Sequence, residues 1–184
     1  MTVVNGYKEK DNEQKIEILN LEELEERAKQ IIPTGEVGYS VGGSENNWTL
    51  KANRKAFTHK QIVPRALSNI EDPQLDTNVF GIPLKTPIMM APTAAQGLAH
   101  SQGEKDTAKG VAAVGGLMAQ STYSSASISD TAAVGDGAPQ FFQLYMSKDW
   151  GFNYSLLDEA KKASVKGIIL TVDATVDGYR EADI

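Results

Sequence analysis

Polar side chains stand directly after short apolar runs in the second half of this 184-residue sequence. Ser121 follows the first of three such runs, Gln143 and Tyr145 end the second, and Thr171 and Asp173 end the third. A spacing of two residues places both side chains of a pair on the same face of a strand. Neutral hydroxyl and amide groups can hydrogen-bond to a polar ligand. Asp173 is expected to be buried and therefore to need a partner, because an unpaired buried charge is costly.

The segments that would position these side chains alternate between short apolar runs and helical stretches. The runs begin near residues 88, 117, 141 and 168, with separations of 29, 24 and 27 residues, and helices are predicted over about 104–114, 128–134 and 154–163. This alternation predicts βα units and a parallel sheet, which is an α/β fold class. The turn at residues 91–97 lacks the glycine-rich fingerprint of a doubly wound sheet. Polar side chains at several strand exits instead indicate the active face of a (β/α)₈ (TIM) barrel.

Two helices are predicted in the first third of the chain. The first covers residues 20–32, where Asn20 can cap the helix and Glu23 completes a capping box. The second begins after residue 44, and we expect Trp48, Ala52 and Phe57 on its core-facing side. These helices precede the predicted barrel strands in the chain.

The remaining N-terminal segments are predicted to be less regular. Residues 35–43 predict a loop that contains Tyr39, and residues 60–86 predict small strands joined by turns. We therefore expect two parts, namely an arm with helices and small strands over 1–86 and the first half of a barrel over 87–184. The first dozen residues are expected to form a solvated arm.

The composition argues against several classes of protein. Lys and Arg total 18 against 24 Asp and Glu, so the net charge of −6 disfavours a nucleic-acid binder. The absence of cysteine excludes thiol chemistry, and the histidines, His59 and His100, lack the spacing of metal ligands. No apolar run approaches the roughly 18 residues of a membrane span, and the first residues lack a secretory pattern. A cytoplasmic protein with neither a membrane nor a nucleic-acid partner is expected.

The motifs along the chain resemble those of the FMN-dependent α-hydroxy acid oxidases and, within that family, the bacterial enzymes that oxidise L-lactate. The resemblance covers nearly the whole chain and keeps the order and spacing of the motifs. It rests on Tyr39, Ile88-Met89-Met90-Ala91-Pro92-Thr93-Ala94-Ala95, Gly97-Leu98-Ala99-His100, Gln120-Ser121, Gln143-Leu144-Tyr145, Leu170-Thr171-Val172-Asp173 and Arg180.

The resemblance implies a cofactor, FMN, and residues that would hold it. Pro92, Thr93 and Ala94 would lie against the isoalloxazine ring, where small size is the useful property. The hydrogen-bonding partners of the ring would be Ser121, Gln143 and Thr171. Each of these residues also has an ordinary interpretation, as a turn residue or as a strand-end hydrogen bond, but three polar residues on successive strands favour the ligand-binding interpretation.

The resemblance also implies substrate-binding and catalytic roles. Tyr39, Tyr145 and Arg180 would bind the substrate carboxylate, with Arg180 acting as a bidentate fork. Without the resemblance, the two tyrosines would be packing residues and Arg180 a solvated arginine. Asp173 would orient a catalytic histidine and stabilise its protonated form. That histidine is absent from this chain.

A barrel of this family needs eight strands, and the sequence predicts four. We therefore expect a C-terminal half-barrel segment of the same protein as a partner, because a four-stranded half leaves open sheet edges and an uncovered interior. The family also implies a homotetramer. The expected reaction is oxidation of L-lactate to pyruvate with reduction of O2 to H2O2. The alternatives are oxidation of glycolate or a longer hydroxy acid, a dehydrogenase that reduces a quinone, and a non-catalytic half-barrel.

Overall fold

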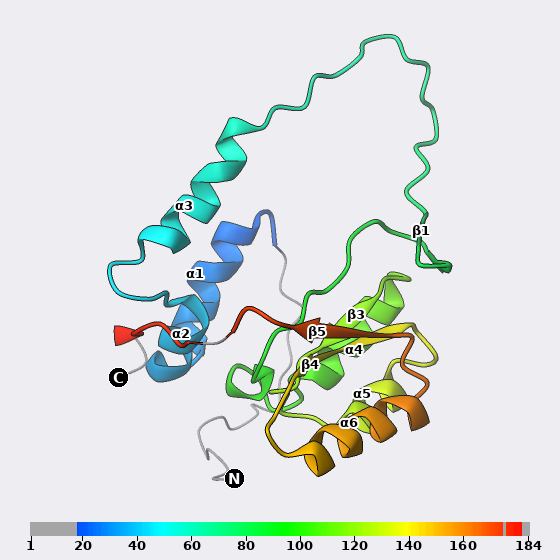
Figure 1. Ribbon diagram of the computed structural model, residues 1–184. Coiled ribbons are helices and arrows are strands. Elements are labelled where there is room, and N and C mark those ends of the chain that lie inside the picture. The colour runs from blue at the N-terminus through cyan, green and yellow to red at the C-terminus, as the bar shows by residue number, and fades with distance from the viewer. Residues whose placement is uncertain (1–17, 175, 182–184) are drawn as a thin grey trace. The chain divides into compact units, whose positions relative to one another are not determined.

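A computed structural model describes residues 18–174 and 176–181 (Figure 1). The contacts within these residues define two compact units. Unit 1 covers residues 74–174, and unit 2 covers residues 18–73 together with 176–181. The solvated arm predicted for the first dozen residues lies outside the described residues. The predicted boundary after residue 86 stays a prediction.

Unit 2 is helical. It contains α1 (Leu21–Ile31), α2 (Thr34–Val41), α3 (Trp48–Ala56) and the 3₁₀ turn η1 (Phe57–His59). The N-terminus of α1 is capped as predicted, because the side chain of Asn20 accepts a hydrogen bond from the Glu23 amide at 2.7 Å. Arg27 also pairs with Glu23 one turn along the helix.

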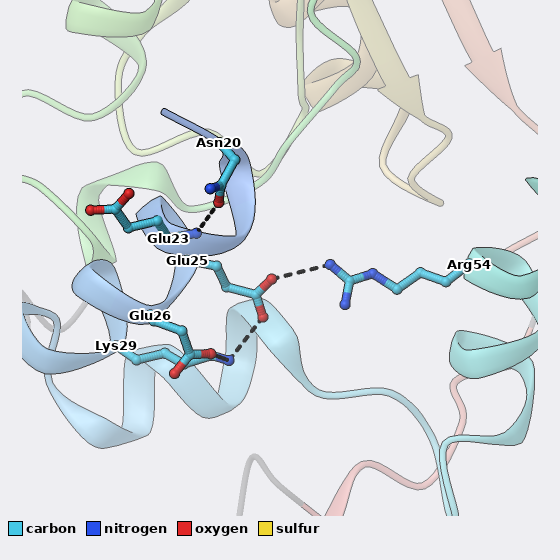
Figure 2. A network of polar contacts seen from close by, with 6 residues as sticks. All are labelled: Asn20, Glu23, Glu25, Glu26, Lys29 and Arg54. Atoms are coloured by element: carbon cyan, nitrogen blue, oxygen red, sulfur yellow. Dashed lines mark hydrogen bonds and ion pairs between the residues drawn. The ribbon is translucent and has the colours of Figure 1, made fainter. Parts of the chain in front are cut away.

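An ion-pair network joins α1 to α3 (Figure 2). One carboxylate oxygen of Glu25 lies 2.9 Å from Lys29 Nζ, and the other accepts a hydrogen bond from Arg54 Nη2 at 3.2 Å. The hydrogen bond from Lys29, more than the charge of Arg54, holds the pKa of Glu25 below its ordinary value of 4.5. Hydrogen bonds to Glu26 and Glu25 raise the pKa of Lys29 above 10.5.

Two expectations for unit 2 are wrong. Residues 34–41 form α2 where a loop was predicted, so Tyr39 lies on a helix. The side chains of Trp48 and Phe57 are 72% and 80% exposed, so neither packs into a core within the described residues. The helix that they flank does form, over Trp48–Ala56.

Unit 1 begins with a small antiparallel hairpin of β1 (Thr77–Val79) and β2 (Ile82–Leu84). Residues 60–76, where small strands were also predicted, contain no helix or strand. The unit then alternates helices and strands as predicted: η2 (Gln96–Leu98), α4 (Glu104–Ala113), β3 (Met118–Gln120), α5 (Ile128–Val134), β4 (Gln140–Tyr145), α6 (Trp150–Lys162) and β5 (Gly167–Thr171).

The strands of this alternating part form a parallel sheet in the order β3-β4-β5. Gln143 pairs with Ile169 and Tyr145 with Thr171 across the ladder between β4 and β5. The predicted first barrel strand is shorter than expected, because it joins the sheet only through a bridge between Met90 and Met118. The sheet therefore has three full strands within the described residues.

The two faces of β4 have different environments. Phe142 and Leu144 point to one face, where they form a buried core with Ile128 of α5 and Ala160 of α6. Gln143 and Tyr145 point to the other face, as the alternation of side chains along a strand requires. The helices thus cover one face of the sheet, and the polar side chains lie on the other.

β5 is exposed on both faces. Ile168, Ile169 and Leu170 are 45%, 38% and 49% exposed. Within the described residues β5 pairs with β4 alone. Strands of a parallel sheet are normally buried on both faces, so β5 has the composition of an interior strand and the exposure of an edge. None of the helices in the described part of the chain is long and apolar enough to cross a membrane.

Candidate functional site at the carboxyl ends of the strands

Three of the predicted site residues form a hydrogen-bonded row across the sheet. The hydroxyl of Ser121, just after β3, donates to Oε1 of Gln143 on β4 at 3.3 Å. Nε2 of Gln143 donates to the hydroxyl of Thr171, the last residue of β5, at 2.8 Å. Ser121 and Gln143 are buried, and Thr171 is partly buried. The structure therefore brings together the polar ends of three neighbouring strands, as their sequence positions predicted.

Thr122, which the sequence analysis did not single out, fixes this row. Its amide donates to Gln143 Oε1 at 3.2 Å, and its hydroxyl donates to the Gln143 carbonyl oxygen at 2.6 Å. The same hydroxyl accepts a hydrogen bond from the amide of Tyr145 at 3.0 Å. Its position after Ser121 was visible in the sequence, but nothing in the pattern distinguished it from a turn residue.

Tyr145 lies on the same face of β4 as Gln143 and is partly exposed. Its ring packs against that of Tyr123, with 5.2 Å between the ring centroids. The backbone of Tyr123 reaches a second loop, since its carbonyl oxygen accepts a hydrogen bond from the Ala95 amide at 3.0 Å. The loop after Met90 and the loop after β3 therefore lie side by side at the strand exits.

The loop after Met90 carries the predicted Pro92, Thr93 and Ala94. The first two residues are exposed and Ala94 is half-buried. The Thr93 hydroxyl donates to the Ala91 carbonyl oxygen at 3.3 Å. The next residue, Ala95, has a left-handed backbone with φ 52°, so the chain turns sharply after Ala94.

Tyr39 and Arg180 are in contact within unit 2, although 141 positions separate them in the sequence. Nη2 of Arg180 donates to the Tyr39 carbonyl oxygen at 2.6 Å, and the guanidinium lies 5.4 Å from the centroid of the Tyr39 ring. Two of the three residues predicted to bind the substrate carboxylate are therefore adjacent.

Asp173 follows β5 and is exposed, so the expectation that it is buried is wrong for this chain. No hydrogen bond or ion pair reaches its side chain from the residues that the structure describes. The physical reason is the exposure of β5 itself, because no element among the described residues covers the exit of that strand. An exposed carboxylate keeps its hydration, so it does not need the partner that burial would require.

The row of side chains at these strand ends has the chemistry of a site for a polar, neutral ring. It combines hydroxyls, which both donate and accept, with one carboxamide. No cluster of acidic or histidine side chains suited to a metal occurs among the described residues. The position of the row, at the carboxyl ends of parallel strands, is where α/β barrels bind their ligands.

The sequence pattern of the FMN-dependent dehydrogenases matches residues 28–184. The chain belongs to this family. The family name identifies FMN as its cofactor, and the residues present fit that group, since hydroxyls and an amide can meet the donors and acceptors along the polar edge of a flavin ring.

Relatives within the family include oxidases of several hydroxy acids. The chain is 77% identical over 184 residues to an L-lactate oxidase of Lentilactobacillus hilgardii, covering all of this chain and 50% of that protein. It is 40% identical over 169 residues to a glycolate oxidase of Spinacia oleracea, covering 92% of this chain and 46% of that protein. The chain thus spans about half the length of the curated relatives that it matches.

Solved structures of the FMN-dependent family have the same fold. A Pediococcus acidilactici protein described as a lactate oxidase superposes with a TM-score of 0.92 at 74% identity, over 99% of this chain and 51% of that one. A mandelate oxidase superposes with a TM-score of 0.85 at 32% identity, over 91% of this chain and 48% of that one. The predicted fold class is confirmed: the chain supplies the N-terminal helices and first strands of a (β/α)₈ barrel.

Proposed function

We propose that this chain is the N-terminal half of an enzyme that oxidises L-lactate to pyruvate with FMN and reduces O2 to H2O2. The observation that carries the proposal is the row of Ser121, Gln143 and Thr171 at three adjacent strand exits. The similarity to L-lactate oxidases supports the choice of substrate.

The polar row would hold the flavin ring. Ser121, Gln143 and Thr171 would hydrogen-bond to its polar edge, and Pro92, Thr93 and Ala94 would lie against it. When bound, FMN would supply the two-electron chemistry between the substrate and dioxygen. The buried position of Gln143 supports this role, because hydrogen bonds from Ser121, Thr122 and to Thr171 hold its amide in one orientation.

Arg180, Tyr39 and Tyr145 would bind the substrate carboxylate. A guanidinium has five N–H donors, so its bond to the Tyr39 carbonyl oxygen is compatible with a bidentate grip on a carboxylate. The Tyr39 ring beneath the guanidinium would fix its orientation. The hydroxyls of Tyr39 and Tyr145 would add hydrogen bonds to the substrate.

Asp173 would orient a histidine that the C-terminal half supplies. That histidine would take the proton of the substrate hydroxyl, and the carboxylate would stabilise the resulting imidazolium. In this proposal the exposure of Asp173 ends when the C-terminal half covers the exit of β5.

The exposure of β5 supports the C-terminal half as a partner. A further parallel strand would pair with its open edge, and a further helix would cover Ile168 and Leu170. We call this chain together with that half the complete enzyme. A homotetramer in the cytoplasm stays our expectation for its assembly and location.

Anaerobic titration of the complete enzyme tests the proposal. The purified protein should be yellow, L-lactate should bleach the flavin absorbance, and air should restore it with release of one H2O2 per lactate consumed. Glycolate and 2-hydroxybutyrate should bleach it more slowly at equal concentration. Faster bleaching by glycolate or 2-hydroxybutyrate would refute L-lactate as the preferred substrate. A colourless protein that does not take up FMN would refute the whole proposal.

A further inference from the structure

Glu104 is the first residue of α4, and its side chain is fully buried. Its Oε1 accepts two backbone hydrogen bonds, from the amide of Gln96 at 3.1 Å and from the amide of Ser125 at 3.0 Å. Gln96 follows the Pro92–Ala94 segment, and Ser125 lies in the loop after β3 that also carries Ser121. One carboxylate oxygen therefore joins the loops that leave two neighbouring strands.

Close backbone approaches surround this carboxylate. A Cβ on Gly97 would lie 2.7 Å from the Ser125 side chain, and a Cβ on Gly103 would lie 2.8 Å from the Gly97 nitrogen. Gly103 also has a φ of 45°, which favours glycine. The Gly97 amide donates to the Ser125 hydroxyl at 3.0 Å. The two loops and the start of α4 are thus packed so closely that a side chain at Gly97 or Gly103 would not fit without movement of its neighbours.

A second set of hydrogen bonds extends from Gln96 to the segment of the candidate site. The Thr107 hydroxyl, one turn along α4, donates to Gln96 Oε1 at 2.5 Å. Gln96 Nε2 donates in turn to the carbonyl oxygen of Thr93 at 3.3 Å. Glu104 thus holds the backbone of Gln96, and Thr107 holds the Gln96 side chain. The Gln96 side chain in turn holds the backbone of Thr93.

We propose that Glu104 is a positioning residue that sets the location of the Thr93–Ala94 backbone relative to the Ser121–Gln143–Thr171 row. This inference rests on the proposed function, because that function makes the Thr93–Ala94 backbone and the polar row two parts of one flavin site. Glu104 would touch neither the cofactor nor the substrate, and its effect would pass through Gln96 and Ser125.

The chemistry of Glu104 favours positioning over plain stabilisation. Its Oε2 is buried and has no hydrogen-bond partner among the described residues, which is a cost that an apolar side chain would avoid. Its Oε1 accepts hydrogen bonds from backbone amides in two different loops, so this single atom holds the two loops together. A glutamine could keep the acceptor oxygen, whereas an alanine removes it and an aspartate withdraws it by one methylene.

The first test measures the two hydrogen bonds and needs no cofactor. In the complete enzyme, with and without FMN, residue-resolved hydrogen exchange should show the amides of Gln96 and Ser125 exchanging about tenfold faster or more in Glu104→Ala than in wild type. Glu104→Gln should stay near the wild type. The Asp130 amide, which donates to Ser127 Oγ, is the internal control and should not change. Unchanged exchange at Gln96 and Ser125 would overturn the inference even if the wild type binds no FMN.

The second test measures the consequence for the site. Glu104→Ala should lower the anaerobic rate of flavin reduction by L-lactate about 10- to 100-fold and shift the flavin absorbance maximum, with KM for lactate changed less than about twofold. Glu104→Gln should recover most of the rate. Ala160→Gly removes a buried methyl from the core between α6 and the sheet, and it should lower thermal stability while leaving the rate and spectrum unchanged.

The outcomes separate this inference from the proposed function. If L-lactate does not bleach the flavin of the wild type, the proposed function is refuted. The hydrogen-exchange experiment then tests the role of Glu104 on its own. An active wild type with an equally active and spectrally unchanged Glu104→Ala overturns the inference alone. An equal loss of rate in Ala160→Gly also overturns it, because general destabilisation would then explain the effect. If Glu104→Ala does not fold, Glu104→Asp decides, and wild-type rates and exchange in that variant would contradict the positioning role.

Discussion

Gln143 on β4 donates a hydrogen bond to the hydroxyl of Thr171 on β5 at 2.8 Å. Thr171 lies two residues beyond Ile169, which is the partner of Gln143 in the ladder. The bond crosses between strands on the face that the helices leave uncovered. Because Gln143 also accepts from Ser121 and Thr122, its carboxamide is the centre of the polar row.

Replacing Gln143 by leucine should weaken FMN binding by at least about tenfold in the complete enzyme. The substitution leaves three polar groups without their partner, at a cost of roughly 1–3 kcal/mol for each group that stays buried, and about 1.4 kcal/mol corresponds to a tenfold change in affinity. Quenching of FMN fluorescence on titration measures the Kd. Ala160→Gly, which alters the core on the opposite face of the sheet from the row, should keep the wild-type Kd. An unchanged Kd in Gln143→Leu would exclude this residue from the cofactor site.

Arg180→Lys should raise KM for L-lactate by about tenfold or more. A lysine cannot make a bidentate bond to a carboxylate and also stack as a planar group on the Tyr39 ring. Tyr39→Phe is the matched variant, because it keeps the ring and the carbonyl oxygen that contact Arg180 and removes only the hydroxyl. It should have the smaller effect. Steady-state kinetics that place both variants at the wild-type KM would remove this pair from the substrate site.

Asp173→Asn should lower the rate of flavin reduction by about 100-fold, with a small change in KM, because general acid–base catalysis contributes roughly 10²- to 10⁴-fold. Stopped-flow absorbance under anaerobic conditions separates this step from reoxidation. Asp177→Asn, four residues later and also exposed, is the control. A wild-type rate of reduction in Asp173→Asn would mean that no catalytic base depends on this carboxylate.

The exposed apolar side chains of β5 predict how the chain behaves without its C-terminal half. Expressed alone, it should bind the dye ANS and aggregate, since Ile168, Ile169 and Leu170 present an unpaired parallel strand. Co-expression with the C-terminal half should abolish both effects. A monomeric chain that does not bind the dye, as judged by light scattering and ANS fluorescence, would contradict the predicted partner.

The ion pairs of α1 predict a pH effect on unit 2. Glu25 has a pKa below 4.5 in the folded protein, so its contribution to stability is present above that pH and is lost as the pH falls through the lowered pKa. Carbon-13 NMR of the side-chain carboxyl should show this low midpoint. Lys29→Met should move it toward 4.5 by more than Arg54→Met does, because the hydrogen bond from Lys29 is the larger cause. The reverse order would contradict this assignment.

The βα part of the fold could be predicted because short apolar runs alternate there with helical stretches at regular spacing. α5 covers Ile128–Val134, the bounds predicted for it, and the side chain of Ser127 caps it. α2 was missed because Gly35 and Gly38 have low helix propensity, although the helix forms over Thr34–Val41. The exposure of Trp48 was missed because periodicity identifies the apolar side of a helix but not whether anything covers it.

The part of the candidate site that could be predicted from the sequence is the part at the carboxyl ends of the strands. Ser121, Gln143 and Thr171 could be placed together because parallel strands bring their carboxyl ends to one edge. Glu104 could not, because a glutamate in the first turn of a helix ordinarily indicates a solvated side chain near the helix dipole. Its burial depends on the close approach of two loops, which no local pattern encodes.

An experimental structure of the complete enzyme with FMN bound would show whether the polar row holds the flavin. We expect Gln143 Nε2 and the Thr171 hydroxyl to lie within about 3.5 Å of heteroatoms on the polar edge of the flavin ring. We also expect the Thr93–Ala94 backbone against the ring. A flavin bound elsewhere, with the Ser121–Gln143–Thr171 row facing only protein or water, would show that this row does not bind the cofactor.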